Sequence, residues 1–403
     1  MAAFVTSLKH VLRLSGISAL LATSSLSFGG AGDHIKAGNA IIKPSLDLGV
    51  EFRTNVLQSP SDALGGPNLF VQPGFDIESK SANTDFSLTS LYTLRKHFQA
   101  DLVRADRYTD FDLGTNLNLM RSSVIGFRLS DRASVRNDNN LQSLHTRMHN
   151  GLGAQMAIRP GPILELRLGG SWDYDRFLVP PSGLGQSGSV NPILLSQRNT
   201  VGPTFEAEWR FFPRTAFILD SEYSFYLWSN DSGTQSNTNT KQARIRAGLR
   251  GRLTERLVVS FLLGYGSGKY TDTVKVSGLT GLLAEAQVRY SFNEKHQLAV
   301  GYQKNFEDVY FSDFVSFNRI YSRYTGEFSP KFSMNLSVYA NFDEYKGAVT
   351  RSDLFLDSSV NFVFKANKWM SLTAGTAWQK RDSTDRLVSY DDVRVQTFIS
   401  FDY

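Results

Sequence analysis

Residues 332–343 read FSMNLSVYANFD, and their side chains alternate between apolar and polar along the chain. The even-numbered positions are apolar, whereas the odd-numbered ones carry serine, asparagine, tyrosine and aspartate. Successive side chains of an extended strand point to opposite faces, so a two-residue period separates the two classes. The stretch therefore predicts a β-strand with one apolar face and one polar face.

The same period recurs from about residue 45 to the end of the chain. Residues 46–53, 111–119 and 164–173 each place most of their large apolar side chains on one face and charged, amide or small residues on the other. No stretch sustains the i, i+3, i+4, i+7 spacing of an amphipathic helix. The pattern indicates an all-β protein.

The breaks between these segments are alternately short and long. Eight tight turns separate nine long-looped hairpins, which predicts about eighteen antiparallel strands with both chain ends on the tight-turn side. A further hairpin hidden in residues 91–108 would change that number. Tight breaks fall at residues 80–83, 121–123, 159–162, 212–215, 253–256, 293–296, 329–331 and 366–368, and longer polar ones include 57–68, 137–143, 178–197, 230–239 and 383–390.

These strands fit a membrane better than a soluble sandwich, propeller or solenoid. Each has about twenty residues with its share of turn, more than the roughly 9 to 11 that a transmembrane strand requires. Aromatic residues lie near segment ends, as in girdles at a membrane interface: Trp172, Tyr174, Trp209, Phe211, Tyr290, Phe292 and Trp369. We expect one transmembrane antiparallel up-and-down β-barrel over residues 32–403.

Composition excludes several other classes. The 403 residues include no cysteine, which rules out disulfides, thiolate metal clusters and a lipoprotein anchor. Charged residues interrupt every apolar run after the N-terminus before the roughly 18 residues of a membrane helix. The net charge of +5 is spread along the chain rather than gathered in one block, so it indicates no nucleic-acid partner.

The N-terminus has the composition of a secretion signal. Lys9, His10 and Arg13 precede a short apolar and small-residue stretch, and no acidic residue occurs before Asp33. This order matches the n-region and h-region of a signal peptide. We predict a signal peptide over residues 1–31, with an amphipathic cytoplasmic helix as the alternative, and hence export to the outer membrane of a Gram-negative-type bacterium.

Two short motifs carry a family resemblance. Residues 50–56 read VEFRTNV, a Ser/Pro-containing loop follows at residues 59–62, and Pro73-Gly74-Phe75 comes next. With these motifs the chain resembles the outer-membrane β-barrel porin family, type 2, although Thr54 stands where that family usually has aspartate. The resemblance implies an outer-membrane barrel of the kind found beside exopolysaccharide assembly clusters. It suggests polymer export with a periplasmic polysaccharide export protein as partner.

The final strand also implies a partner. Its apolar face ends in an aromatic residue, Tyr403, and the strand resembles the C-terminal signal read by the bacterial barrel-assembly machinery. The other expected surroundings are outer-membrane lipids, against which the apolar face lies.

The polar face is expected to line the lumen, which in a barrel of this size is wide enough for water. Its charges have two interpretations. A row of arginines could attract anionic groups, or each could pair with acids on neighbouring strands, which we favour. Inward aromatic rings could serve sugar rings or pack beneath loops. The pore-lining candidates are Arg244, Arg246, Arg250, Arg252, Arg319, Arg323, Glu206, Glu208, Asp220, Glu222, Tyr226, Tyr321 and Tyr339.

Catalytic motifs are weak, and the sequence predicts neither a cofactor nor a bound metal. His145 and His149 have metal-ligand spacing but lack the H-E-x-x-H glutamate, so we interpret them as polar lumen residues. Gly264, Gly266 and Gly268 lack the spacing of a phosphate-binding loop, so we interpret them as small wall residues.

Three functions remain open at this point. The chain could be a passive conduit, an outer-membrane enzyme such as a phospholipase or protease, or a structural or adhesive barrel. We favour the conduit, with a secreted polysaccharide as cargo and small polar solutes or anions as the alternative. Residues 178–197, with Pro180, Pro181 and three glycines, form the best candidate for a loop folded into the lumen.

Overall fold

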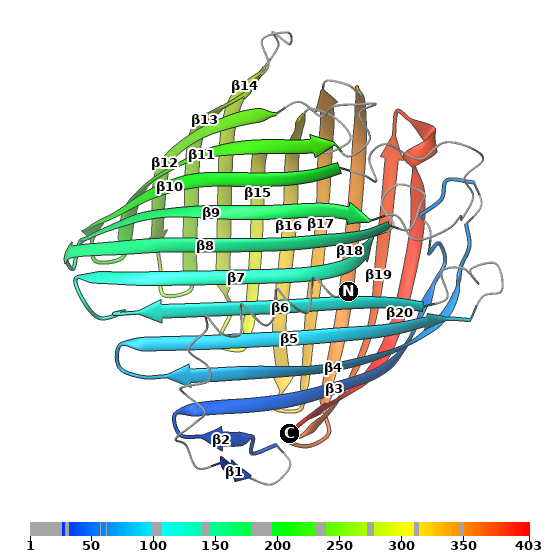
Figure 1. Ribbon diagram of the computed structural model, residues 1–403. Coiled ribbons are helices and arrows are strands. Elements are labelled where there is room, and N and C mark those ends of the chain that lie inside the picture. Colours follow the sequence, from blue (N-terminus) through cyan, green and yellow to red (C-terminus); the bar gives the residue numbers. More distant parts are fainter. Residues whose placement is uncertain are drawn as a thin grey trace.

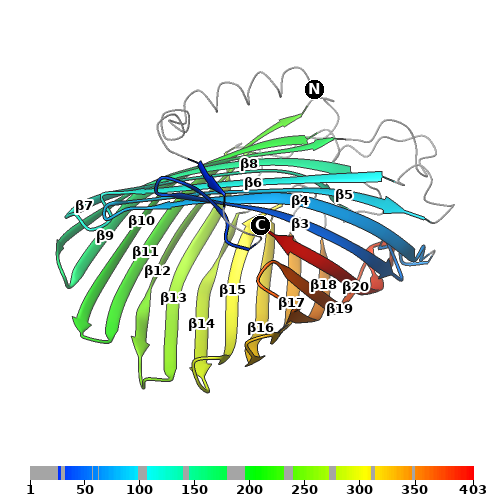
Figure 2. The same cartoon turned by 90° about the horizontal axis from the view of Figure 1, so that it is seen from below.

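Eighteen long antiparallel strands form a closed barrel, which confirms the predicted fold and strand number. The structure is a computed structural model that describes residues 26–28, 32–56, 58–61, 63–98, 107–138, 145–178, 196–230, 239–271, 278–309, 314–346 and 350–403. In Figure 1, β4–β9 form the near wall and run across β15–β18 of the far wall, and Figure 2 shows the same two walls from below.

Every strand from β3 to β20 pairs with its sequence neighbours, and β20 pairs with β3 to close the sheet. All eight predicted tight turns occur between strands. The hidden hairpin in residues 91–108 is not found among the residues described there. The strands are β3 (Ala40–Arg53), β4 (Gly66–Lys80), β5 (Thr84–His97), β6 (Arg107–Leu119), β7 (Ile125–Asp138), β8 (His145–Gly161), β9 (Leu164–Leu178), β10 (Ser196–Phe212), β11 (Thr215–Asn230), β12 (Thr240–Arg252), β13 (Leu257–Tyr270), β14 (Leu279–Ser291), β15 (His296–Asp308), β16 (Phe314–Ser329), β17 (Phe332–Lys346), β18 (Arg351–Lys365), β19 (Met370–Ser383) and β20 (Tyr390–Asp402), with a 3-10 turn at Arg386–Val388.

The closing seam joins the first long strand to the last one. Its register runs from Arg394 opposite Arg53 to Asp402 opposite Ser45. Gly49 leaves room for the rings of Phe70 and Phe398, because a Cβ there would come within 2.4 Å of either side chain.

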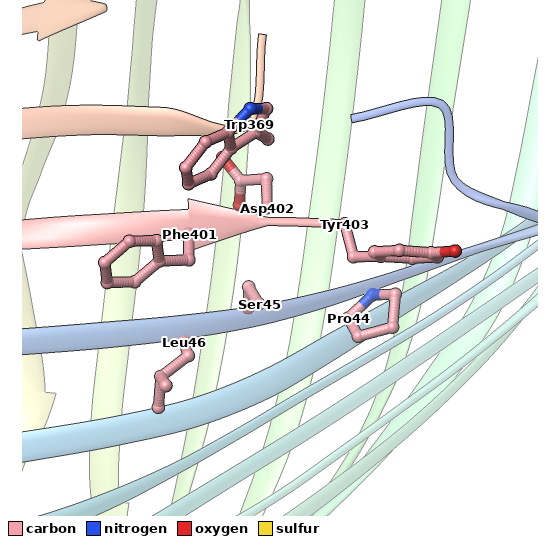
Figure 3. A pocket seen from close by; sticks show the side chains of 7 residues that line it. All are labelled: Pro44, Ser45, Leu46, Trp369, Phe401, Asp402 and Tyr403. Atoms are coloured by element: carbon pink, nitrogen blue, oxygen red, sulfur yellow. The ribbon is translucent and has the colours of Figure 1, made fainter. Parts of the chain in front are cut away.

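A small apolar cleft of about 250 Å³ lies at the tight-turn end of the seam. There the end of β20 runs beside the first residues of β3, as Figure 3 shows, and the ring of Trp369 stacks with that of Phe401 at 6.1 Å. The cleft is lined by Pro44, Ser45, Leu46, Trp369, Phe401, Asp402 and Tyr403.

The outward face of the barrel is apolar, as the alternation predicts. Its large side chains are exposed at the protein surface, for example Leu282 at 70% and Val50 at 55%. A continuous apolar surface of this kind is what contact with lipid requires. Within the described ranges, no helix is long and apolar enough to span a membrane.

The expected aromatic girdles are present at both ends of the wall. Trp172 and Tyr174 stack at 6.4 Å toward the long-loop rim. At the tight-turn rim, Trp209 contacts Phe211 at 5.7 Å and Tyr290 contacts Phe292 at 5.0 Å. Their places at the two ends of the apolar band fit the two water interfaces of a bilayer.

Two short strands precede the barrel. β1 (Leu26–Phe28) pairs with β2 (Ile35–Ala37), which pairs with the start of β3. His34 Nδ1 donates to the main-chain oxygen of Tyr403 at 2.7 Å, so this segment contacts the other chain end. The predicted signal peptide lies largely outside the described residues and stays a prediction.

The two faces of β17 provide a direct test of this orientation. We expect Val338→Arg to lower the free energy of unfolding by about 2–4 kcal/mol, because it places a charge near the middle of the lipid-facing band. Ser337→Arg, on the inward face beside Ser359, should cost much less. Urea unfolding in lipid vesicles measures both changes. Equal losses for the two variants would contradict the assigned faces.

Candidate functional site

The inward face of the barrel carries every predicted pore-lining residue. All thirteen lie at strand positions that alternate with the outward apolar side chains. Parts of this face are open to water, since the side chains of Arg132 and Arg136 on β7 are 64% and 53% exposed. The inside of the barrel is therefore not packed solid.

The row of four arginines on β12 divides into two pairs with different surroundings. Arg246 binds Asp220 at 2.9 Å and Glu285 at 3.1 Å, and Arg244 lies 3.5 Å from Glu222. The side chains of Arg250 and Arg252 are exposed and make no hydrogen bond or ion pair to any described residue. The favoured interpretation, pairing into the wall, therefore holds for the first two arginines and fails for the other two.

This division predicts different results for two double variants. Arg250→Gln with Arg252→Gln should lower the anion-to-cation permeability ratio about twofold or more, because both charges face water. Arg244→Gln with Arg246→Gln should instead lower the unfolding midpoint by a few degrees, roughly the effect of 1–2 kcal/mol, since it leaves carboxylates without partners. Reversal potentials in planar bilayers and thermal scans distinguish the two results. The same selectivity shift in both variants would contradict the division.

Most buried polar side chains lie toward the long-loop ends of their strands, so the outer half of the lumen is the more tightly packed half. Asp175 on β9 is the centre of one cluster there, with a side chain only 2% exposed. It accepts hydrogen bonds from Arg147 at 2.6 Å and Arg198 at 2.7 Å, and His149 Nδ1 lies 3.0 Å from it. Three neighbouring strands, β8, β9 and β10, are tied together by this one carboxylate.

Arg198 also reaches a strand that is not its neighbour. It donates to the main-chain oxygen of Asp308 on β15 at 3.1 Å, and Thr240 on β12 donates to the Asp308 carboxylate at 2.6 Å. β15 lies five strands away from β10 in the sheet. The long-loop end of β15 must therefore lean across the inside of the barrel toward β10 and β12.

The sheet register explains how β15 leans inward. Its ladder with β14 ends at Lys304, while its pairing with β16 continues to Asp308. We call residues 305–308 of β15 and 314–317 of β16 the inner arm. The ring of Phe306 covers Leu283 and Gly266, and the ring of Phe314 lies over Gly268. Gly266 and Gly268, two of the three glycines predicted to be small wall residues, thus make room for these two rings.

The inner arm yields a matched pair of variants. A Cβ at Gly266 would come 2.5 Å from the Phe306 ring, so Gly266→Val should push the arm away and cost about 1–3 kcal/mol of stability. Gly281 lies directly opposite on β14, and a Cβ there meets nothing within 4 Å. Gly281→Val should therefore leave both stability and single-channel conductance nearly unchanged, whereas Gly266→Val alters both. Identical behaviour of the two variants would show that the arm does not rest on β13.

Arginine and aromatic side chains alternate around the wall from β16 to β20. Arg319 lies over the rings of Phe317 at 5.3 Å and Tyr339 at 5.8 Å. The Tyr339 ring contacts that of Phe355 at 5.7 Å. Arg381 then lies over Phe355 at 5.4 Å and Tyr390 at 5.5 Å. We call these six residues, Phe317, Arg319, Tyr339, Phe355, Arg381 and Tyr390, the arginine–aromatic belt.

Other predicted residues have more local contacts. Arg323 lies over the ring of Tyr321, whose hydroxyl accepts from Gln287 at 2.9 Å. Tyr226 is buried beneath Arg198, and Glu206 and Glu208 both pair with Arg167. Parity in the sequence identified these inward positions. It missed Arg198, Asp175, Asp308 and Arg381, whose importance comes from contacts between strands.

Of the two histidines with metal-ligand spacing, the structure describes the side chain of His149. His149 is held by Asp175 and lies 4.0 Å from Asp173, while the side chain of His145 lies outside the described residues. Within the described ranges, His149 has no hydrogen bond to a serine hydroxyl, as a nucleophilic triad would require. Most of the loop predicted to fold inward, residues 179–195, also lies outside the description.

The family described as "Putative beta-barrel porin 2" matches residues 191–402, more than half of the chain. The chain belongs to this family of β-barrel porins. This confirms the predicted resemblance, although the motifs that suggested it lie before the matched range. No curated protein matches the sequence.

Solved barrels are similar to this one in fold alone. The FrpB iron transporter from Neisseria meningitidis has a TM-score of 0.52 at 10% identity, covering 92% of this chain and 70% of its own. The siderophore receptor PirA from Acinetobacter baumannii has a TM-score of 0.50 at 10% identity, covering 89% and 80%. OpdL from Pseudomonas aeruginosa has a TM-score of 0.47 at 13% identity, covering 91% and 99%. Family and fold together indicate a porin-like channel of the outer membrane.

Proposed function

We propose that this porin-like channel conducts a secreted polysaccharide across the outer membrane. The arginine–aromatic belt is the observation that carries the proposal. Aromatic faces in a polar lumen offer sugar rings an apolar surface, and guanidinium and amide groups beside them donate hydrogen bonds to hydroxyls. Arg319 also donates to Asn341 at 2.7 Å, so polar groups border the rings throughout. Such a surface suits a carbohydrate better than a bare ion.

The distribution of contacts also suits a moving chain. Conduction requires several binding sites, each of them weak, so that the cargo can both enter and leave the channel. The belt spreads modest ring contacts over five strands instead of gathering them in one deep pocket. Most inward charges in the outer half are already paired, which favours a neutral or weakly charged polymer there over a dense polyanion.

Two protein partners belong to this proposal. A barrel has no energy source of its own, so a periplasmic polysaccharide export protein would deliver the polymer at the tight-turn rim. The barrel-assembly machinery would bind the terminal strand, β20, which pairs with β3 only once the barrel closes.

A second function, diffusion of small polar solutes, has one observation in its favour. The inner arm brings Phe306, Asp308 and Phe314 inward over β12 and β13, which reduces the space in the outer half of the lumen. A narrower outer half favours small cargo. Deleting the gene separates the two functions through surface polysaccharide and nutrient uptake measured in parallel. Unchanged surface polymer with impaired uptake would overturn the export proposal.

Removing aromatic rings from the belt tests the proposed role directly. Tyr339→Leu with Phe355→Leu should weaken blockade of single-channel current by neutral oligosaccharides about tenfold, because roughly 1–2 kcal/mol of ring contact is lost. Tyr223→Leu with Phe225→Leu removes two contacting rings from the lipid-facing side and serves as the control. Blockade that is unchanged in the belt variant, or equally weakened in both, would remove the belt from the mechanism.

A further inference from the structure

A polar pocket of about 530 Å³ opens on the inner face of the barrel near the tight turns of β5–β10. That rim faces the periplasm in outer-membrane barrels. Four arginines and three acidic residues contribute to its lining, together with two amides, Asn118 and Gln155. The pocket lies far from the belt, at the end where a periplasmic solute first meets the lumen.

The three acids of the pocket are already bound by arginine. Asp85 pairs with Arg121 at 2.6 Å. Glu165 pairs with Arg167 at 3.0 Å, and Arg167 also pairs with Glu206. All three carboxylates of the pocket are therefore paired, and Arg121 and Arg167 are the two arginines that hold them at the shortest distances.

Of the other two arginines, Arg128 on β7 has an exposed side chain that makes no ion pair or hydrogen bond to any described residue. By contrast, Arg159 on the neighbouring strand is engaged, since it donates to the main-chain oxygens of Arg121 and Ser123 and lies 3.5 Å from Glu165. Arg128 is therefore the guanidinium in this pocket whose donors remain available.

Two amide side chains flank Arg128 in register. It lies opposite Asn118 on β6 and opposite Gln155 on β8, and side chains directly opposite one another have Cβ atoms about 4.5–5.5 Å apart. Neither amide makes a hydrogen bond to the described part of the chain. Three inward side chains with unused donors thus lie side by side on neighbouring strands.

We propose that Asn118, Arg128 and Gln155 bind a carboxylate group at the periplasmic end of the lumen. The planar guanidinium matches a carboxylate with two parallel hydrogen bonds, and the amides supply further donors on either side. A single uncompensated positive charge suits a monoanion. The nearby carboxylates of Asp85, Glu165 and Glu206 disfavour a doubly charged phosphate through repulsion.

This site goes beyond the proposed export function and does not depend on it. The carboxylate can belong to a uronic acid residue of an acidic polymer or to a small organic acid. Either cargo would meet the pocket before reaching the belt.

The test uses the purified full-length protein in planar bilayers, with ligand added at the tight-turn side. Glucuronate should block the current at a concentration about tenfold or more below that of glucose. Arg128→Gln should weaken glucuronate blockade about ten- to a hundredfold, because a charge-assisted hydrogen bond is lost. Arg132→Gln makes the same change on the same strand, beside Asp112 at 3.7 Å, and should weaken it less than threefold.

A neutral variant separates a site from a general effect of charge. Asn118→Leu with Gln155→Leu leaves the charge unchanged and should still weaken glucuronate blockade severalfold. Equal blockade by glucose and glucuronate, or equal losses in Arg128→Gln and Arg132→Gln, would overturn the site. Tighter binding of oligoglucuronate than of the monomer assigns the carboxylate to a polymer, whereas equal binding assigns it to small acids. Both of these last results support carboxylate recognition.

Discussion

The absence of water in the hydrocarbon core of a bilayer is the constraint on which the whole structure depends. Every backbone N–H and C=O group at that depth must be paired within the protein, and strands achieve this only when the sheet closes. Here closure takes place between β20 and β3, the strands most distant in sequence. The tight turns, the apolar outward face and the aromatic girdles all follow from an edge-free sheet in lipid.

In the closed barrel, the polar side chains of the inward face must find partners among themselves or in water. The two halves of the lumen differ in which of these they use. In the outer half, carboxylates such as Asp175 and Asp392 are buried and bound by arginines from neighbouring strands. A buried charge without a partner is costly, so each of these carboxylates needs its arginine in the folded barrel. Near the tight turns, water reaches the side chains, and Arg250 and Arg289 remain exposed there without such partners in the described chain.

Much of the fold could be predicted because strand alternation and turn length are local signals. A period of two places Arg244, Tyr339 and Glu206 on the face opposite the apolar side chains without knowledge of any neighbour. The inner arm could not be predicted in this way, since the meeting of Arg198 with Asp308 depends on where the β14–β15 ladder ends. The glycines of β13 were visible in the sequence, but their role could be recognised only from the contacts of Gly266 and Gly268 with the rings of Phe306 and Phe314. The arginine–aromatic belt likewise could not be predicted without the strand register, which places Arg381 opposite both Phe355 and Tyr390.

The two halves of the lumen therefore differ in what they can recognise. In the outer half, arginines are engaged with carboxylates or aromatic rings, so the positive potential of their guanidinium groups is largely cancelled. Recognition of cargo there depends mainly on shape and on contact with aromatic rings. In the inner half, free guanidinium groups project into water, where an attraction for anions acts over about 10 Å at 0.1 M salt. Cargo entering from the periplasm would thus be selected first by charge and afterwards by its fit against aromatic rings. A channel built in this order can attract acidic cargo without holding it, because the unpaired guanidinium groups lie near the tight turns and not among the paired charges of the outer half.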